Sequence, residues 1–179
     1  LFQVVTSFRA RGADGQQQSQ DGRSWEAIRD GATALDAAVF SDWTTGVNYT
    51  AGKTPGYVQQ QRVSAGFFRV LGVAPALGRE FDASEDREGG PRAAILSHRL
   101  WQTTLAGDPG VIGRAVLLRG EPYTVIGVMP AGFRSSTLAD LWTPLKPNTK
   151  GEGSGTNYAI VGRLKPGATL AQAEGQLGG

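Results

Sequence analysis

The sequence predicts a domain of the α+β class, and three observations support this prediction. A helical pattern lies near the start, a strand-rich stretch fills the middle, and a strand, a turn and a helix close the chain. Glycine accounts for 26 of the 179 residues and proline for 9, which favours many turns and short elements. Hydrophobic residues make up 40% of the chain and charged residues 19%, a balance typical of a globular protein with a buried core.

The first third of the chain predicts strands on either side of one helix. Residues 2–10 are rich in strand-forming side chains, whereas residues 11–23 are polar, contain three glycines and predict an exposed loop. Ser24 is a candidate N-cap of a helix over residues 24–35, because apolar side chains recur there at helical spacing. The next expected elements are one or two strands within 37–50, a turn at 52–55 and a strand over 56–63.

The rest of the chain predicts short helices and strands in alternation. Two helices are expected to begin at a serine cap: one from Ser64 to Gly72, the other from Ser97 to Leu105. The core residues expected from the first of these are Phe67, Phe68 and Leu71. An acidic loop is expected over 82–91, and a loop rich in glycine, serine and proline over 146–156. The other expected elements are a helical turn at 111–112, strands over 92–96, 115–118, 122–128, 140–145 and 157–164, and a helix over 169–177.

Charge and composition exclude several classes of function. The net charge is +2 and the basic residues are spread singly, so no nucleic-acid partner is expected. The chain has no cysteine, which excludes disulfides, thiolate metal sites and cysteine nucleophiles. No apolar run reaches the roughly 18–20 residues that span a bilayer, and no signal peptide is visible. Because the sequence starts at Leu1 within a predicted strand, we expect a segment of a longer protein.

No catalytic residue and no cofactor-binding residue is predicted. His98 is the only histidine, and it directly follows Ser97. Neighbours in sequence rarely meet as nucleophile and base, so we expect a helix cap followed by a surface histidine. The run Gly52-Lys53-Thr54 resembles the end of a phosphate-binding loop, but Val47 stands where that motif needs glycine and Pro55 follows where its helix would begin. A hairpin turn is therefore expected at this run.

No metal site is predicted either. The densest group of oxygen ligands lies in the acidic loop and resembles a calcium-binding loop in its spacing. Arg87 stands where that loop needs glycine, and Ala93 stands where it needs glutamate, so a capped, solvated turn is expected. The run Gly151–Gly155 lacks the helix that follows a dinucleotide fingerprint and predicts a flexible loop. The acidic group consists of Asp82, Ser84, Glu85, Asp86 and Glu88.

The four tryptophans are scattered and do not predict a sugar-binding surface. Trp25, Trp101 and Trp142 lie among apolar neighbours, and large aromatic side chains contribute strongly to cores, so these three are expected in the core. Trp43 lies near a predicted turn and is the one expected at the surface.

Five blocks of sequence follow one another in the middle of the chain: Val63–Val73 (VSAGFFRVLGV), Ala76–Phe81 (ALGREF), Gly90–Trp101 (GPRAAILSHRLW), Gly107–Arg114 (GDPGVIGR) and Tyr123–Pro130 (YTVIGVMP). No single block is diagnostic alone. In this order and spacing, they resemble the extracytoplasmic core domain of MacB/FtsX-like ABC transporter permeases, and in particular a group of bacterial permeases typical of acidobacteria. The similarity covers Trp25 to Gln176 and is strongest over 61–134 and over 163–173.

The resemblance implies a two-lobed mixed domain between two membrane helices of an inner-membrane protein, with this domain in the periplasm. Residues 1–63 and 157–179 would form a membrane-proximal strand-helix lobe, and residues 64–156 an inserted, strand-rich distal lobe. Such a domain is not an enzyme. It would couple ATP-driven motion of the membrane helices to substrate export or to periplasmic events. The implied partners are an ABC ATPase subunit or domain, and a second permease copy or an internal homologous half.

Two other functions remain open at the level of sequence. A periplasmic domain that binds a carbohydrate or peptide would use loops 11–23 and 146–156 as its binding edge, with exposed aromatic residues such as Trp43 or Tyr49. A hydrolase with one histidine and no cysteine would need a Ser/Lys or a paired-carboxylate scheme. The binding residues, the transported substrate and the oligomeric state are not predicted.

Overall fold

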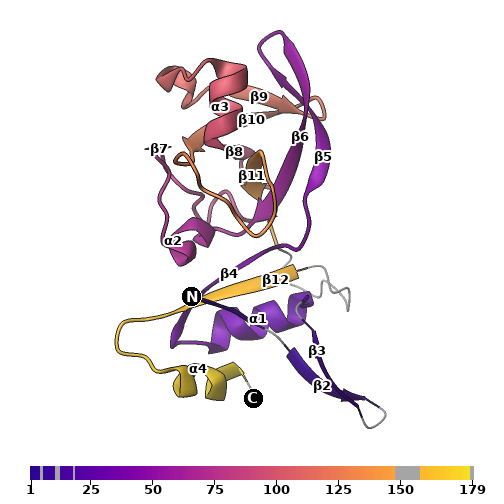
Figure 1. Cartoon of the computed structure of the whole chain (residues 1–179), viewed down its shortest axis with the longest axis vertical. Coiled ribbons are helices and arrows are strands. Elements are labelled where there is room, and N and C mark those ends of the chain that lie inside the picture. The colour runs from indigo at the N-terminus through magenta and orange to yellow at the C-terminus, as the bar shows by residue number, and fades with distance from the viewer. Residues whose placement is uncertain (5, 11–12, 18, 148–157, 178–179) are drawn as a thin grey trace.

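The computed structural model describes residues 1–4, 6–10, 13–17, 19–147 and 158–177, and confirms the α+β class (Figure 1). The helices are α1 (Gly22–Gly31), α2 (Phe67–Leu71), α3 (His98–Leu105) and α4 (Leu170–Leu177), with a 3₁₀ turn at Pro109–Val111. The strands are β1 (Phe2–Val4), β2 (Thr6–Ala10), β3 (Ala13–Gln17), β4 (Leu35–Ser41), β5 (Thr45–Ala51), β6 (Thr54–Val63), β7 (Leu77–Gly78), β8 (Ala93–Leu96), β9 (Ala115–Leu118), β10 (Glu121–Val128), β11 (Leu141–Pro144) and β12 (Tyr158–Leu164).

Six strands in the upper part of Figure 1 close into a ring. Neighbours run in the order β6, β11, β8, β10, β9 and β5, with β6–β11 and β8–β10 parallel and the others antiparallel. The hairpin of β5 and β6 then pairs from Thr45–Gln60 to Ala51–Thr54 and returns the ring to its first strand. Closure of this kind pairs strand edges that an open sheet would expose.

Three further strands extend this sheet in the lower part of the molecule. They lie in the order β1, β12 and β4, and β12 pairs with β4 along its whole length from Tyr158–Ser41 to Leu164–Leu35. Helices α1 and α4 lie on one side of these strands, and β2 and β3 form a separate hairpin (Figure 1). Both ends of the chain lie in this lower part (Figure 1).

Alternation of side chains along the strands divides the core into three clusters. Along β8, Ala94 and Leu96 point into the ring, whereas Ala93 and Ile95 point to the other face of the sheet. That second face packs under α2 together with Phe68, and a third cluster lies between β4, β12 and helices α1 and α4. This is the two-residue periodicity of strands that are buried on both faces.

The ring and the lower strands meet where β4 passes β6, at the only register pair these strands share, Phe40–Val63. Serine side chains provide the missing ladder bonds. The backbone N–H of Val39 donates to the Ser64 Oγ at 3.0 Å, and that of Ser64 donates to the Val39 carbonyl at 2.8 Å. The backbone N–H of Arg62 donates to the Ser41 Oγ at 3.1 Å. We call this region, from Val39 to Ser41 and from Gln61 to Ser64, the junction.

Two local predictions are wrong in the first quarter of the chain. Residues 13–17, expected in a loop, form β3, because they pair with β2 in a hairpin. The sequence of β3 has no alternation of apolar and polar residues that would predict a strand. The first helix begins two residues early, at Gly22, and ends early, at Gly31. The Asp21 carboxylate caps it, accepting from the Ser24 backbone N–H at 2.8 Å, so Ser24 is inside the helix. Leu35 belongs to β4, where it pairs with Leu164.

The cap of α2 is also different from the prediction. Gly66, in a left-handed conformation, precedes the helix, and no side chain caps it, because Ser64 is used at the junction. Phe67 and Phe68 are buried as predicted, but Val70 is buried where Leu71 was expected. Gly72 does end the helix, at φ +77°. The cap at Ser97, the hairpin of β9 and β10 and the closing helix are confirmed.

We predict that Phe68→Ala lowers the free energy of unfolding by about 3–5 kcal/mol, the usual cost of removing a buried aromatic side chain. The Phe68 ring is 1% exposed and contacts the rings of Phe67, Phe81, Phe133 and Trp142. Urea unfolding of the purified chain measures the change. Leu138→Ala is the control, because Leu138 is 75% exposed and its loss should change the free energy by less than about 0.5 kcal/mol. Equal effects of the two substitutions would contradict the described core.

Candidate functional site

The structure has a cleft on the ring, which we define by the residues that line it from three segments. These are Gln59 on β6, Ser97–Arg99 at the start of α3, and much of the segment 130–142 that joins β10 to β11. The cleft is half open and encloses about 530 Å³. A volume of this size lies in the range typical of ligand-binding pockets.

Backbone hydrogen bonds hold the walls of the cleft in place. The N–H of Ser97 donates to the Asp140 carbonyl, and the N–H of Asp140 donates to the Gln59 carbonyl, both at 2.8 Å. The Asp140 carboxylate accepts from the Gln59 N–H at 2.9 Å and pairs with Arg99. Asp140 thus ties β6, α3 and β11 together, so the cleft is formed before any ligand binds.

The junction is a second site of interest, because buried polar side chains concentrate there. Ser41, Gln61 and Ser64 are all at most 3% exposed. Both polar atoms of the Gln61 side chain are hydrogen-bonded: Nε2 donates to the Ser41 carbonyl at 3.3 Å, and Oε1 accepts from the Trp142 Nε1 at 3.1 Å. Buried polar groups that are all hydrogen-bonded specify one geometry, since any slip would leave one of them unpaired.

Helix α2 connects the two parts beside the junction. It packs on β4 and β12, and the Arg163 Nε on β12 donates to the Val70 carbonyl near the end of the helix at 2.6 Å. Gly72 makes room for this arginine. A Cβ at position 72 would lie 2.8 Å from the Arg163 guanidinium, so a side chain there would displace it. Arg163 therefore links the lower strands to the helix that covers the ring.

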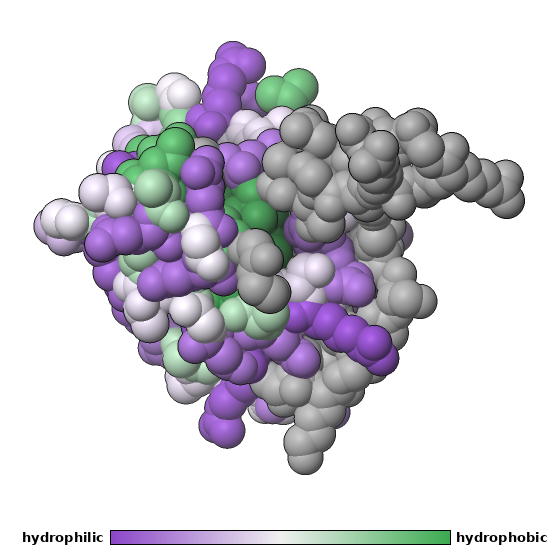
Figure 2. Space-filling view, turned by 90° about the horizontal axis from the view of Figure 1, so that it is seen from below, coloured by the Kyte–Doolittle hydropathy of each residue, from purple (hydrophilic) through white to green (hydrophobic). Residues whose placement is uncertain are grey.

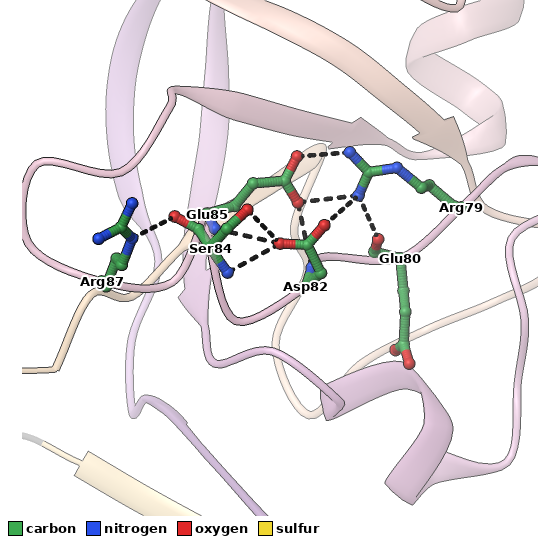
Figure 3. A network of polar contacts seen from close by, with 6 residues as sticks. All are labelled: Arg79, Glu80, Asp82, Ser84, Glu85 and Arg87. Carbon is green, nitrogen blue, oxygen red and sulfur yellow. Dashed lines mark hydrogen bonds and ion pairs between the residues drawn. The ribbon is translucent and has the colours of Figure 1, made fainter.

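The acidic loop forms an internal network of hydrogen bonds and ion pairs (Figure 3). Glu85 is 4% exposed, and both of its carboxylate oxygens accept from the Arg79 guanidinium, at 2.7 and 2.9 Å. Asp82 accepts from the Ser84 hydroxyl at 2.6 Å and from the Ser84 backbone N–H at 2.8 Å, and these hydrogen bonds lower the pKa of the Asp82 carboxyl. Within the described part of the chain, no three Asp, Glu, His or Cys residues could hold a metal ion. The predicted cap is confirmed at Asp82, but the turn is not solvated throughout as predicted, because Glu85 is buried.

Asp86 in the same loop reaches two other segments. Its Oδ2 accepts from the Ala65 backbone N–H at 2.8 Å, just before α2, and its Oδ1 accepts from the Lys146 N–H at 2.7 Å, just after β11. Burial raises the pKa of this carboxyl above its ordinary value of 3.8, and the two backbone N–H groups offset part of that rise. Asp86 thus holds the acidic loop against the end of the ring.

The single histidine and the lysine of the apparent phosphate-binding loop lie in the local structures expected from the sequence. Ser97 caps α3 by accepting from the Leu100 N–H at 3.1 Å, and the His98 ring stacks edge-on against Trp101 at 5.4 Å. Lys53 lies in the turn of the β5–β6 hairpin, as expected. The run Gly151–Gly155 lies outside the described residues.

The tryptophans lie mainly as predicted. Trp25 and Trp142 are buried at 7% and 1%, Trp101 is half-buried, and Trp43 is 46% exposed. Tyr49, considered as an exposed aromatic, is instead buried at 2% inside the ring. The cleft was not predicted, because its residues come from three separated segments and no local pattern brings them together.

We predict that Asp86→Asn destabilises the chain by about 1–3 kcal/mol. In the wild type, each carboxylate oxygen of Asp86 accepts from one backbone N–H. In the variant, the amide nitrogen would replace one of these oxygens and leave one backbone N–H without an acceptor. The pH dependence has a definite sign. The folded-state pKa is raised, so the stability contributed by the Asp86 titration is fully present below the unfolded value of 3.8 and is lost as the pH rises through the folded value. The difference between wild type and Asp86→Asn should therefore shrink between pH 4 and pH 7 in urea unfolding.

The matched control for this prediction is Glu88→Gln, which removes an exposed charge from the same loop. It should change the free energy of unfolding by less than about 0.5 kcal/mol at either pH. A difference for Asp86→Asn that grows with pH would show that the hydrogen bonds to the carboxylate outweigh its burial.

Comparison with known proteins gives the family. The family described as MacB-like periplasmic core domain matches residues 1–179, which confirms the resemblance carried by the five sequence blocks and the periplasmic location it implies. No curated protein sequence matches the chain. In the part of the chain that the structure describes, no helix is long and apolar enough to cross a membrane.

Two solved structures show the same fold at low sequence identity. One is the periplasmic region of MacB from Actinobacillus actinomycetemcomitans, at 16% identity and a TM-score of 0.66, covering 90% of this chain and 72% of that one. The other is the extracellular domain of the ABC-type transporter YknZ from Gram-positive bacteria, at 19% identity and a TM-score of 0.63, covering 89% and 79%. With the family match over its whole length, the chain belongs to the MacB-like periplasmic core domain family.

Proposed function

We propose that this chain is the non-catalytic extracytoplasmic module of an ABC transporter permease, which passes motion of membrane helices to the periplasm. Family membership over the whole chain carries this proposal. The similar solved structures, a periplasmic region of MacB and an extracellular domain of an ABC-type transporter, support it. The transported substrate is not part of the proposal.

The arrangement of the two parts supports a mechanical role. Both ends of the chain lie in the lower part, so membrane helices joined to them would act on β1, β12 and α4 (Figure 1). The ring is joined to these strands at the junction and through α2. The face seen from below in Figure 2 is mainly hydrophilic, with smaller hydrophobic patches, as suits a surface next to water and lipid headgroups.

The two lobes stay a proposal, with residues 1–63 and 157–179 next to the membrane and residues 64–156 beyond them. One element lies differently from this division: the β5–β6 hairpin pairs with β9 and β11 and so takes part in the ring. We therefore place the mechanical boundary at the junction, where β6 ends.

The partners are part of the same proposal. An ATPase subunit or domain on the cytoplasmic side would supply energy, and a second permease copy or an internal homologous half would complete the transporter. No residue is assigned a catalytic role, because the histidine, lysine and acidic groups weighed as candidates have structural partners or stand alone.

We predict that Ala83→Cys in the full-length permease reacts with a membrane-impermeant maleimide added to cells whose outer membrane has been opened. Ala83 is exposed in the acidic loop, and this chain has no cysteine to give background labelling. Ala94→Cys is the matched control, because Ala94 is 0% exposed and should react only after denaturation. Labelling of Ala83→Cys only after the cytoplasmic membrane is opened would refute the proposed location.

We predict that Arg163→Ala uncouples the ring from the membrane helices. In the wild-type transporter, ATP should change backbone hydrogen exchange in β12 and also in the ring strands. In the variant the change should remain in β12 but weaken at least twofold in the ring, because the Arg163–Val70 hydrogen bond is lost. The control is Arg114→Ala, which removes an arginine paired with Asp108 far from the junction in sequence and fold. An unchanged response of the ring in Arg163→Ala would contradict this route.

A further inference from the structure

We propose that the cleft between α3 and the segment 130–142 binds an extended peptide segment in which an apolar side chain lies beside a carboxylate. Neither the family nor the proposed transporter role assigns a ligand to this cleft, and the inference does not depend on that role. It rests on the shape of the cleft, on its exposed apolar residues and on the sign of its charge.

The apolar part of the cleft is left uncovered. Leu138 is 75% exposed, the largest exposure among the large hydrophobic side chains of the described residues. Phe133 lines the same cleft, and its ring lies 5.5 Å from that of Trp142, which is buried. A leucine or similar side chain placed between Leu138 and Phe133 would remove apolar surface of both partners from water.

The charge of the cleft is positive. Arg99 and Arg134 both line it, whereas the one carboxylate among its lining residues is that of Asp140. Asp140 is already paired with Arg99 and accepts from the Gln59 N–H. Arg134 is exposed and has no ion pair among the described residues. An incoming carboxylate therefore meets a free guanidinium, whereas an incoming lysine or arginine meets repulsion.

The shape favours a chain segment over an enclosed small molecule. The cleft is half open, so a peptide can enter and leave along it, and about 530 Å³ accommodates a few residues. Its fixed walls, joined through Ser97, Asp140 and Gln59, lower the ordering cost of binding. The lining residues of the cleft come from α3, β6 and the segment 130–142. Strand β6 and helix α3 belong to the upper part of the molecule, whereas the N-terminal strand β1 lies in the lower part (Figure 1).

The site differs from the one expected from the sequence, whereas a peptide was among the ligands expected there. A ligand-binding domain was expected to use loops 11–23 and 146–156, but residues 13–17 form β3, and residues 148–157 lie outside the described chain. The cleft is built from α3, β6 and the segment before β11 instead. An acidic, apolar peptide is the chemistry that these residues match.

The test uses the 179-residue chain and four fluorescein-labelled peptides, read by fluorescence anisotropy at low salt. The probe is Glu-Leu-Leu-Glu, and the matched peptides are Gln-Leu-Leu-Gln, Glu-Ser-Ser-Glu and Lys-Leu-Leu-Lys. We expect the first to bind at least fivefold more tightly than each of the others, because only it satisfies both the guanidinium and the apolar wall. Equal binding of all four, preference for the lysine peptide, or no binding of the first up to 1 mM would overturn the proposal.

Two cleft variants and one control test whether the peptide binds in the cleft. Arg134→Gln should weaken binding of Glu-Leu-Leu-Glu by about three- to tenfold, in line with the loss of one charge-assisted contact, and Leu138→Ser should weaken it similarly. Arg23→Gln, an exposed arginine on α1, is the matched control and should leave affinity unchanged. Circular dichroism checks that each variant folds; because Arg134 and Leu138 are both exposed, folding should be unaffected. Equal affinity of Arg134→Gln and Arg23→Gln would move the site elsewhere and refute the inference.

Discussion

The rest of the structure depends on the hydrogen bonds at the junction, where two parts of one sheet share the single register pair Phe40–Val63. A sheet that narrows to one pair would leave backbone groups of β4 and β6 unpaired in the core. The hydroxyl groups of Ser41 and Ser64 accept from those backbone groups, so the sheet continues without a full ladder.

Helix α2 packs beside the junction and connects the two parts of the sheet. Helix α2 has only five residues and no side-chain cap, yet Phe67 and Phe68 fill the space between the ring and the lower strands. Arg163 fixes its end from β12, through a space that Gly72 leaves open. In the proposed function, a displacement of β12 would act on α2 through the Arg163–Val70 hydrogen bond, and α2 would act on the aromatic cluster that packs against the ring. The geometry thus suits a module that transmits motion.

Charged groups divide into two kinds in this chain. Those of the acidic loop are used internally: Glu85 pairs with Arg79, and Asp86 accepts from two backbone segments (Figure 3 shows the first pair). At the cleft the balance differs, because Asp140 is fully engaged and Arg134 is left exposed. Paired charges stabilise the fold. The exposed Arg134 guanidinium beside the exposed Leu138 side chain is instead the surface that we propose for peptide recognition. This contrast directs attention to the cleft and away from the denser acidic loop.

The sequence by itself determined the features whose physics is local. The Ser97 cap, the hairpin around Arg119 and Gly120, and the stop at Gly72 follow from hydrogen bonds and backbone conformations within a few residues. The order of its five blocks also identified the family. Tertiary structure alone decided the rest. Ser64 looks like a helix cap but is used by Val39, 25 residues away, and β3 exists only because β2 lies beside it. The ring and the cleft join segments far apart in the chain, and local periodicity carries no information about such pairings, because their energy is gained only when distant strands meet.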